Sequence, residues 1–355
     1  MNYELSIKYV IFFLSVSLLV NSCNTFSSPQ YKGAESSHFD GKRFFNQEQN
    51  PEKSGSGSIL SLFKWLFASN DRDWEWFCYS PPGNPPAKYI GNDSLRVTYI
   101  GHATSLIQFD NINVLTDPVW SNSVGPLNLL NPTRSRPPGI NFEDLPKIDI
   151  VLISHNHYDH CDLATLEHLR DACNPLFLCP LGVKQLLEND GISNVREMDW
   201  WDSITYKKSK IYFVPSKHFS MRGLNDRDNN LWGGYVLETK DGPIYFAGDT
   251  GFGIHFKQIF ERFGKMRLSL LPIGPVEPRW FMSRVHIDGS EAVEAHQILK
   301  SQISIGIHFG TFEQGADDMY EPVEILKQKL IEEKISPKVF RLLFLGKSLD
   351  IPVLK

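Results

Sequence analysis

The sequence of 355 residues predicts an α/β sandwich that forms one continuous domain over most of the chain. Two observations lead to this prediction. Short apolar runs with the length of strands recur between Val97 and Phe344, and segments with helical spacing lie between them. Hairpin-like strands mixed with helices are typical of layered α/β folds.

The elements follow one another in this order. The predicted strands are Val97–Ile100, Thr104–Phe109, Ile112–Thr116, Ile148–Ile153, Leu176–Cys179, Ile211–Pro215, Gly233–Glu238, Ile244–Ala247, Leu268–Pro272, Ser304–Ile307 and Arg341–Phe344. The predicted helices are Leu163–Ala172, Leu181–Asn189, Phe256–Phe263, Gly289–Leu299 and Tyr320–Glu333. The sequence shows no internal repeat, so we expect a single domain over residues 95–355.

The N-terminal residues 1–23 have the pattern of an export signal. Lys8 precedes the apolar segment Tyr9–Val20, which is shorter than the roughly 20 residues of a membrane-spanning helix. Its ending, "LVNSC", resembles a bacterial lipoprotein signal, in which Cys23 is acylated and holds the exported protein on a membrane surface. An ordinary signal peptide or an uncleaved anchor, with Cys23 an incidental thiol, is the alternative.

Two segments separate this signal from the predicted domain. Residues 24–58 are polar and rich in Ser, Gly, Gln and Asn, so we expect a tether that buries little apolar surface. Residues 59–94 begin with an aromatic-rich extension, "ILSLFKWLFASNDRDWEWF". Its aromatic side chains fit a membrane interface, and its helical spacing fits equally a helix packed on the domain.

The charge of the chain argues against nucleic acid as a partner. The net charge is −5, and no run of Lys and Arg stands out. Proteins that follow a phosphate backbone need such a basic footprint.

The stretch "SHNHYDH" (154–160) is the first sign of chemistry, because it directly follows the apolar run Ile148–Ile153. In an extended segment His155 and His157 point to one side. Asp159 and His160 come from the turn beyond, where the bending chain can aim both at a neighbouring point. A pair of histidines alone is often an incidental surface feature, but the full H-x-H-x-D-H pattern indicates a metal site.

Three distant residues stand in similar settings, because each closely follows an apolar strand. They are His218 after "IYFVPSK", Asp249 in "IYFAGDTG" and His308 in "SIGIHFGTF". Each histidine alone could be a core residue with satisfied hydrogen bonds. Strand ends on one rim of a sandwich can converge, however, and zinc fits a set of His and carboxylate ligands.

Taken together, these seven residues resemble the ligand set of the metallo-β-lactamase superfamily, and the resemblance covers roughly residues 95–345. It implies an αββα sandwich of two mixed β-sheets flanked by helices. The segments "YIGHATSLIQFDNINVLTDPVWS", "PIGPVEPRWFM" and "IHFGTF" resemble more narrowly the N-acyl-phosphatidylethanolamine phospholipase D branch and its bacterial relatives.

This resemblance implies two Zn²⁺ ions and assigns their ligands. In the family pattern, one ion is bound by His155, His157 and His218, and the other by Asp159, His160 and His308. Asp249 bridges the two ions. It places His286 at the active site, as a contact to phosphate or a general acid. We expect His102 and Asp117 to lie behind the ligands or in turns. Arg279 and Trp280 either line the entrance or serve packing.

The expected reaction is the hydrolysis of a phospholipid diester by a metal-bridging hydroxide, which gives phosphatidic acid and N-acylethanolamine. A lactone or another ester or phosphoester is the alternative substrate, as in the ascorbate-6-phosphate lactonase-like branch, because one fold hosts many chemistries. A non-catalytic, metal-binding surface lipoprotein is the third possibility. If Cys23 is acylated, each of these would be an exported bacterial lipoprotein anchored to a membrane, facing the periplasm or lying at the cell surface.

Overall fold

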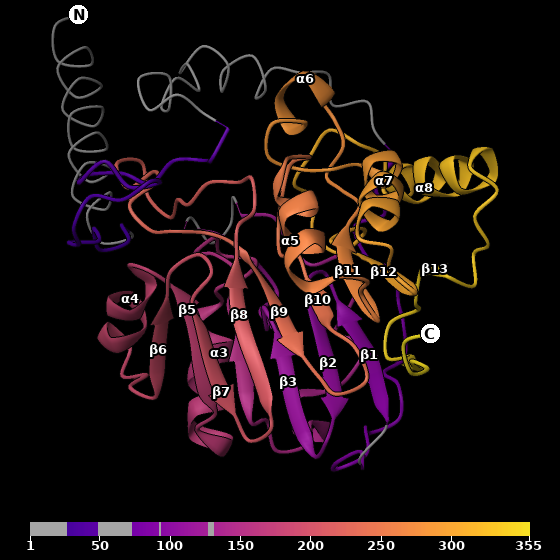
Figure 1. Cartoon of the computed structure of the whole chain (residues 1–355), viewed down its shortest axis with the longest axis horizontal. Helices are drawn as coiled ribbons and strands as arrows, with labels where there is room; N and C mark the ends of the chain where they lie inside the picture. Colours follow the sequence, from indigo (N-terminus) through magenta and orange to yellow (C-terminus); the bar gives the residue numbers. More distant parts are fainter. Residues whose placement is uncertain (1–26, 49–72, 92–93, 127–130) are drawn as a thin grey trace, which may run out of the picture.

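A computed structural model describes residues 27–48, 73–91, 94–126 and 131–355 (Figure 1). The predicted signal segment with Cys23 lies outside the described residues, as does the first part of the aromatic-rich extension. None of the helices within the described ranges combines the length and the apolar composition that a membrane crossing requires.

Two mixed sheets of seven strands form the centre of the fold (Figure 1). In spatial order, the first contains β14 (Ser348–Asp350), β1 (Leu95–Gly101), β2 (Thr104–Phe109), β3 (Ile112–Thr116), β4 (Ile150–Leu152), β5 (Leu176–Pro180) and β6 (Val195–Met198). The second contains β13 (Phe340–Arg341), β12 (Ile303–Ile307), β11 (Leu268–Pro272), β10 (Ile244–Phe246), β9 (Gly234–Glu238), β8 (Ser209–Val214) and β7 (Ser203–Tyr206). Strands β3 to β6 run parallel in one sheet, and β10 to β13 in the other.

Helices cover the outer face of each sheet. In the described part of the chain, the helices of four or more residues are α3 (Leu163–Cys173), α4 (Val183–Asn189), α5 (His255–Phe263), α6 (Arg279–Met282), α7 (Gly289–Ile298) and α8 (Glu321–Glu332), and a 3-10 helix spans Phe142–Asp144. Buried side chains of α3 and α4 pack on the first sheet, whereas those of α5, α7 and α8 pack on the second. The predicted αββα sandwich is therefore confirmed.

The alternation of side chains along the strands produces these layers. In β3, Val114 faces the other sheet and Leu115 faces the helices. In β4, Ile150 and Leu152 join the core between the sheets, and Val151 joins the helical side. β3 and β4 are thus buried on both faces of the sheet, which is why these segments appear in the sequence as nearly continuous apolar runs.

Three strands were not predicted, and each lies at the edge of a sheet: β6, β7 and β14. Their sequences, VREM, SITY and SLD, are mostly polar or partly exposed. An edge strand covers little of the core, so it lacks the apolar run that identifies an interior strand. The last predicted strand is also displaced, because β13 spans Phe340–Arg341 instead of Arg341–Phe344.

The predicted tether is wrong for its described part, residues 27–48. Phe39 and Phe44 are buried in the core that separates the two sheets. The backbone N–H of Phe44 donates to Asp228 O at 2.9 Å, and that of Tyr31 donates to Asn229 O at 3.1 Å. Few apolar residues suffice here, because they fill a gap in an existing core and need not form one of their own.

The described part of the extension, residues 73–91, runs along the domain surface. The indole of Trp74 donates to Ser135 Oγ at 2.8 Å. Trp76, Phe77 and Tyr79, in contrast, are largely exposed.

Candidate metal centre

The seven predicted ligands all lie just beyond the C-terminal ends of strands. His155, His157, Asp159 and His160 follow β4, His218 follows β8, Asp249 follows β10, and His308 follows β12. Strands β8, β10 and β12 run in the same direction in the second sheet. β12 is parallel to β11, which is parallel to β10, and both β8 and β10 are antiparallel to β9, which lies between them. Loops from both sheets therefore meet at one rim of the sandwich.

One cluster contains His155, His157, His218 and Asp249, with one potential ligand atom from each within 4.8 Å of the others. His157 Nδ1 lies 2.7 Å from His155 Nε2 and 3.4 Å from His218 Nε2. The Oδ2 atom of Asp249 lies 3.7 Å from His218 Nε2 and 4.0 Å from His155 Nε2. Three imidazoles and a carboxylate thus point at a common place.

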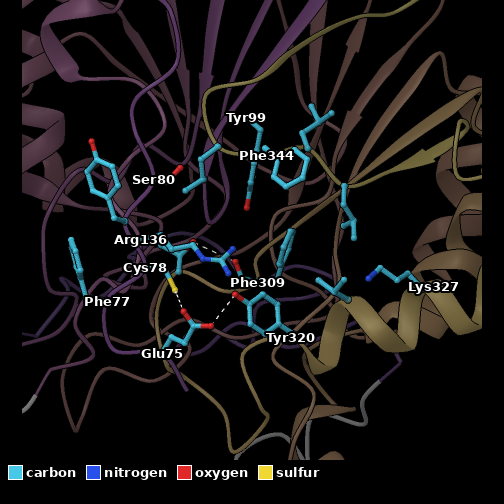
Figure 2. Close-up of a pocket in the computed structure, with 16 residues that line it drawn as sticks. Glu75, Phe77, Cys78, Ser80, Tyr99, Arg136, Phe309, Tyr320, Lys327 and Phe344 are labelled. Atoms are coloured by element: carbon cyan, nitrogen blue, oxygen red, sulfur yellow. Dashed lines mark hydrogen bonds between the residues drawn. The ribbon is translucent and has the colours of Figure 1, made fainter. Parts of the chain in front are cut away.

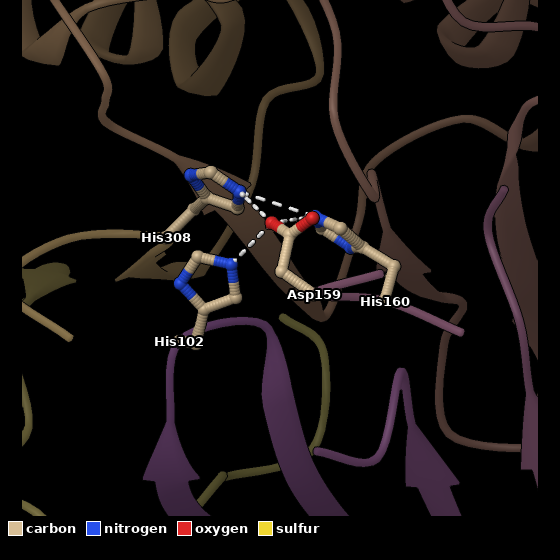
Figure 3. Close-up of side chains that lie close together, drawn as sticks. All are labelled: His102, Asp159, His160 and His308. Carbon is tan, nitrogen blue, oxygen red and sulfur yellow. Dashed lines mark hydrogen bonds and ion pairs between the residues drawn. The ribbon is translucent and has the colours of Figure 1, made fainter. Parts of the chain in front are cut away.

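A second cluster contains His102, Asp159, His160 and His308 (Figure 3). Asp159 Oδ2 lies 3.1 Å from His160 Nε2 and 3.4 Å from His308 Nε2. His102, which we expected behind the ligands, bonds through Nε2 to the same Asp159 oxygen at 2.7 Å. It therefore orients the Asp159 carboxylate, and it is close enough to serve as a ligand itself.

Asp249 lies between the two clusters. Its Oδ2 atom is 3.2 Å from both His160 Nε2 and His308 Nε2, in addition to its approach to His218. Its Oδ1 atom is buried without a hydrogen-bond partner among the described residues. Burial raises the pKa of Asp249, but His160, His308 and His286 outweigh it and hold this pKa well below its usual value. One ionised carboxylate can thus reach metal ions in both clusters.

Oxygen atoms behind the clusters orient four of the imidazole rings. Three rings bond through Nδ1 to an acceptor: His160 to Asp117 Oδ2 at 2.7 Å, His218 to Val285 O at 2.8 Å and His308 to Gly274 O at 3.0 Å. His155 Nδ1 lies 2.9 Å from Ser154 Oγ, which in turn donates to Asp117. A hydrogen on Nδ1 leaves the lone pair on Nε2, which faces the centre.

This arrangement fits metal ions. His160 Nε2 and His308 Nε2 face one another at 3.1 Å although the hydrogen of each ring is engaged at Nδ1. A cation beside them, a proton or a metal ion, would relieve the repulsion between two lone pairs at this distance, and it would also satisfy the Asp249 oxygen that has no partner among the described residues. Imidazole nitrogens and carboxylate oxygens are ligands of zinc and of related transition metals.

The electrostatic environment favours the same chemistry. Burial, followed by neighbouring histidines, lowers the pKa of His155 and His157 well below the usual value, so both rings stay neutral. For His160, burial lowers the pKa, but the carboxylates of Asp249, Asp159 and Asp117 prevail and raise it well above the usual value. The carboxylates thus favour positive charge at His160, which a bound cation can supply in place of the proton, whereas the neutral rings of His155 and His157 offer lone pairs to a metal ion.

His286 lies on the same rim, between α6 and α7. Its Nδ1 atom is 3.7 Å from Asp249 Oδ2 and has no hydrogen-bond partner among the described residues. Arg279 Nη1 donates to its backbone carbonyl at 3.1 Å, and Arg279 Nε lies 3.2 Å from Asp288. Arg279 therefore holds the segment that carries His286. Trp280, beside it, is partly exposed.

Sequence reasoning named the seven residues that the structure brings together in the two clusters, but not all of the groups that support them. Ser154 precedes His155 in the motif, and its contact to Asp117 gives it a role that the motif did not reveal. The carbonyls of Gly274 and Val285 carry no signal in the sequence, since any residue could supply them. Only the folded chain brings these groups behind the imidazoles.

Comparisons with known proteins agree with this geometry. A model of the beta-lactamase superfamily domain matches residues 112–309. N-acyl-phosphatidylethanolamine-hydrolyzing phospholipase D 1 of Caenorhabditis elegans is 38% identical over 253 residues, which cover 68% of this chain and 71% of that relative. A UPF0173 metal-dependent hydrolase of Methanopyrus kandleri is 30% identical over 241 residues, or 65% of this chain and 93% of that relative.

Among solved structures, a metallo hydrolase from Ignicoccus hospitalis aligns with a TM-score of 0.54 and 20% identity, over 74% of this chain and 100% of that chain. This likeness supports the fold. The match to the superfamily model spans more than half of the chain, and the identity to two relatives is 30% or higher. The chain therefore belongs to the beta-lactamase superfamily and is a metal-dependent hydrolase with the metallo-β-lactamase fold.

Proposed function

We propose that the protein is a zinc-dependent phosphodiesterase of the phospholipase D type. Its substrates are N-acyl-phosphatidylethanolamine-like phospholipids, and its products are phosphatidic acid and N-acylethanolamine. The observation that carries the proposal is the position of Asp249. Its Oδ2 atom lies 3.2 Å from the Nε2 atoms of His160 and His308 and 3.7 Å from that of His218. A carboxylate in this position suits a pair of metal ions that share a phosphodiester.

In this proposal each chain holds two zinc ions. His155, His157 and His218 bind one, Asp159, His160 and His308 bind the other, and Asp249 contacts both. Bound zinc supplies Lewis acidity, which polarises the phosphoryl group and lowers the pKa of water.

The protein residues around the ions orient the reacting groups. Asp117 and His102 fix the His160 ring and the Asp159 carboxylate. His286 has a free Nδ1 atom beside Asp249, and burial favours its neutral form by lowering its pKa. A neutral imidazole still donates a hydrogen bond, so His286 contacts the phosphate or the leaving oxygen.

The phospholipid substrate rests on two supports. The relative from Caenorhabditis elegans is named for the hydrolysis of N-acyl-phosphatidylethanolamine. The second support is a pocket of about 730 Å³ (Figure 2), which two residues close to the second cluster line. Phe309, which lines it, follows His308, and Thr311, which lines it too, accepts the backbone N–H of His102 at 3.1 Å.

The walls of this pocket match an amphipathic molecule. Apolar side chains such as Tyr99, Phe309 and Phe344 line it together with the cationic Arg136 and Lys327 (Figure 2). A lipid chain needs apolar walls of this kind, whereas a small lactone does not. The exposed aromatic side chains of Trp76, Phe77 and Tyr79 and an acylated Cys23 would place the exported enzyme at a membrane surface, where it meets lipid at high local concentration.

Product analysis tests this proposal. The full-length, zinc-loaded protein is incubated with mixed vesicles that contain N-acyl-phosphatidylethanolamine, and the lipids are measured by mass spectrometry. We expect phosphatidic acid and N-acylethanolamine in equal amounts. Asp249→Ala should abolish both products, whereas Asp171→Ala, which removes an exposed carboxylate paired with Arg170, should leave them unchanged.

Two other results would contradict the proposal. If the metal-loaded protein leaves the lipid intact but hydrolyses a lactone or another ester, the phospholipase D proposal is wrong and the second chemistry replaces it. A protein that binds metal and cleaves neither class of substrate would be a metal-binding module. Circular dichroism of the Asp249→Ala protein must show a native spectrum for its loss of activity to count.

A further inference from the structure

The N-terminal segment 27–48 reaches the metal centre through Asn46. This side chain is 5% exposed and holds both backbone polar groups of His218. The N–H of His218 donates to Asn46 Oδ1 at 3.0 Å, and Asn46 Nδ2 donates to His218 O at 2.9 Å. The indole of Trp232 donates to the same Oδ1 atom at 3.0 Å, so the amide of Asn46 is fixed in turn.

His218 needs such support because it lies outside the sheets. Strand β8 ends at Val214, four residues earlier, and beyond it the backbone is held at Lys217, whose N–H donates to Thr250 Oγ1 at 3.0 Å and whose carbonyl accepts from Gly251 N–H at 2.7 Å. Within the described residues, the N–H and C=O of His218 bond to Asn46 alone. The ring is held separately, through Nδ1 and the carbonyl of Val285. The Nε2 atom that points at the first cluster is therefore located by one contact to the ring and two to the backbone.

Further contacts fasten the same segment to the loop after His218. The backbone N–H of Ser28 donates to Asp226 Oδ2 at 2.6 Å, and Asn230 Nδ2 donates to Pro29 O at 2.9 Å. Asn230 Oδ1 accepts a bond of 2.8 Å from Asn156, the residue between His155 and His157. The segment thus supports the first cluster from two directions.

We propose that Asn46 is a positioning residue for the metal ligand His218, and that the segment 27–48 is thereby part of the first metal site. The second site takes its ligands from Asp159, His160 and His308, none of which Asn46 contacts. Loss of Asn46 should therefore weaken the binding of the metal ion at the first site and leave the binding at the second site unchanged. Groups that orient metal ligands from behind typically change metal affinity by about 10–100-fold. The inference rests on the two-metal arrangement proposed above, but not on the identity of the substrate.

Zinc titration of the full-length apoprotein tests this inference. Binding is measured by calorimetry and against a chromophoric chelator, and the retained metal is counted by elemental analysis. We expect two zinc ions per chain in the wild type. In Asn46→Ala, one should bind with wild-type affinity and the other about 10–100-fold more weakly. Phe44→Leu is the matched control, because it alters a buried side chain of the same segment whose ring packs on Tyr31, His38 and Phe39.

The control separates positioning from general loosening of the segment. Phe44→Leu should bind both ions with wild-type affinity, even where it lowers the melting temperature as much as Asn46→Ala. Equal weakening in both variants would overturn the inference, as would two tight sites in Asn46→Ala. If the wild type itself fails to bind two ions, the two-metal proposal falls together with it.

A second variant covers the case in which Asn46→Ala does not fold. Asn46→Asp keeps the size and the acceptor oxygen that His218 N–H and Trp232 Nε1–H use. It replaces the donor to His218 O with a carboxylate oxygen, which repels that carbonyl. We expect the same selective weakening of one zinc ion, and unchanged binding of both ions would refute the role of Asn46.

Discussion

At the scale of single residues, Asp228 is expected to make stability depend on pH. It is 6% exposed, and burial raises its pKa to about 6 although Arg227 opposes this shift. In the unfolded chain an Asp has a pKa of about 3.9. Because the folded protein holds this proton more tightly, the stabilisation is complete below about pH 4 and is lost as the pH rises through 6.

Asp228→Asn should therefore raise the free energy of unfolding at pH 7 by on the order of 2 kcal/mol, with no gain at pH 4. Asn also tolerates the left-handed backbone of this position, where φ is 61°. Urea denaturation of both proteins at the two pH values checks this. A gain of equal size at pH 4 and pH 7 would show that burial of the charge is not the cause.

The sequence reveals functional residues when their residue types form a recognisable motif. It reveals little about residues whose role depends on where the fold places them. His155, His157, Asp159 and His160 form a dense pattern in one loop, so the motif alone indicated a metal site. Asn46 lies 172 positions from His218 and stands in a polar stretch that looked like a tether. An amide that bonds to a distant backbone leaves no local pattern, so only the fold reveals it.

At the scale of elements, the N-terminus of α7 should control the segment that carries His286. Asp288 accepts from the backbone N–H of Glu291 at 2.9 Å, and Glu291 reaches back to the N–H of Asp288 at 3.3 Å. This capping box satisfies two helix donors. Asp288→Ala should lower the free energy of unfolding by about 1 kcal/mol, whereas Asp288→Ser, which still caps, should lose much less.

Thermal denaturation of the two variants measures this difference. Because His286 is not among the seven proposed metal ligands, zinc affinity should be unchanged in both. Asp288 also lies 3.2 Å from Arg279 Nε. Equal destabilisation by Ala and Ser would therefore assign the effect to that ion pair and not to the cap.

Elements were predictable in proportion to how deeply they are buried. Strands β2, β3 and β11 have only buried residues, and their predicted and observed bounds coincide. The edge strand β7 has no fully buried residue, and it escaped prediction. Helix α6 has four residues, fewer than a periodic pattern needs to become visible. The pairing of the strands into two sheets came from the family resemblance, since periodicity fixes no partner.

At the scale of the whole molecule, the candidate metal centre lies where the two halves of the sandwich meet. The proposed ligands after β4 follow a strand of the first sheet, and His218, Asp249 and His308 follow strands of the second. Bound metal ions would therefore act as cross-links between the sheets. Without them, buried imidazoles and carboxylates face each other across the same interface.

Removal of the metal should consequently destabilise the entire domain. A ligand present at 1,000 times its dissociation constant stabilises the folded state by about 4 kcal/mol. For a domain of this size that corresponds to a fall in melting temperature of roughly 10 °C on treatment with a chelator. Calorimetry with EDTA, and then with excess zinc, measures the loss and its recovery, and zinc-saturated EDTA serves as the control. Asp249→Ala should show a much smaller response to zinc, because it lacks the carboxylate that reaches both clusters. A melting temperature that chelation leaves unchanged would mean that the centre does not cross-link the two sheets.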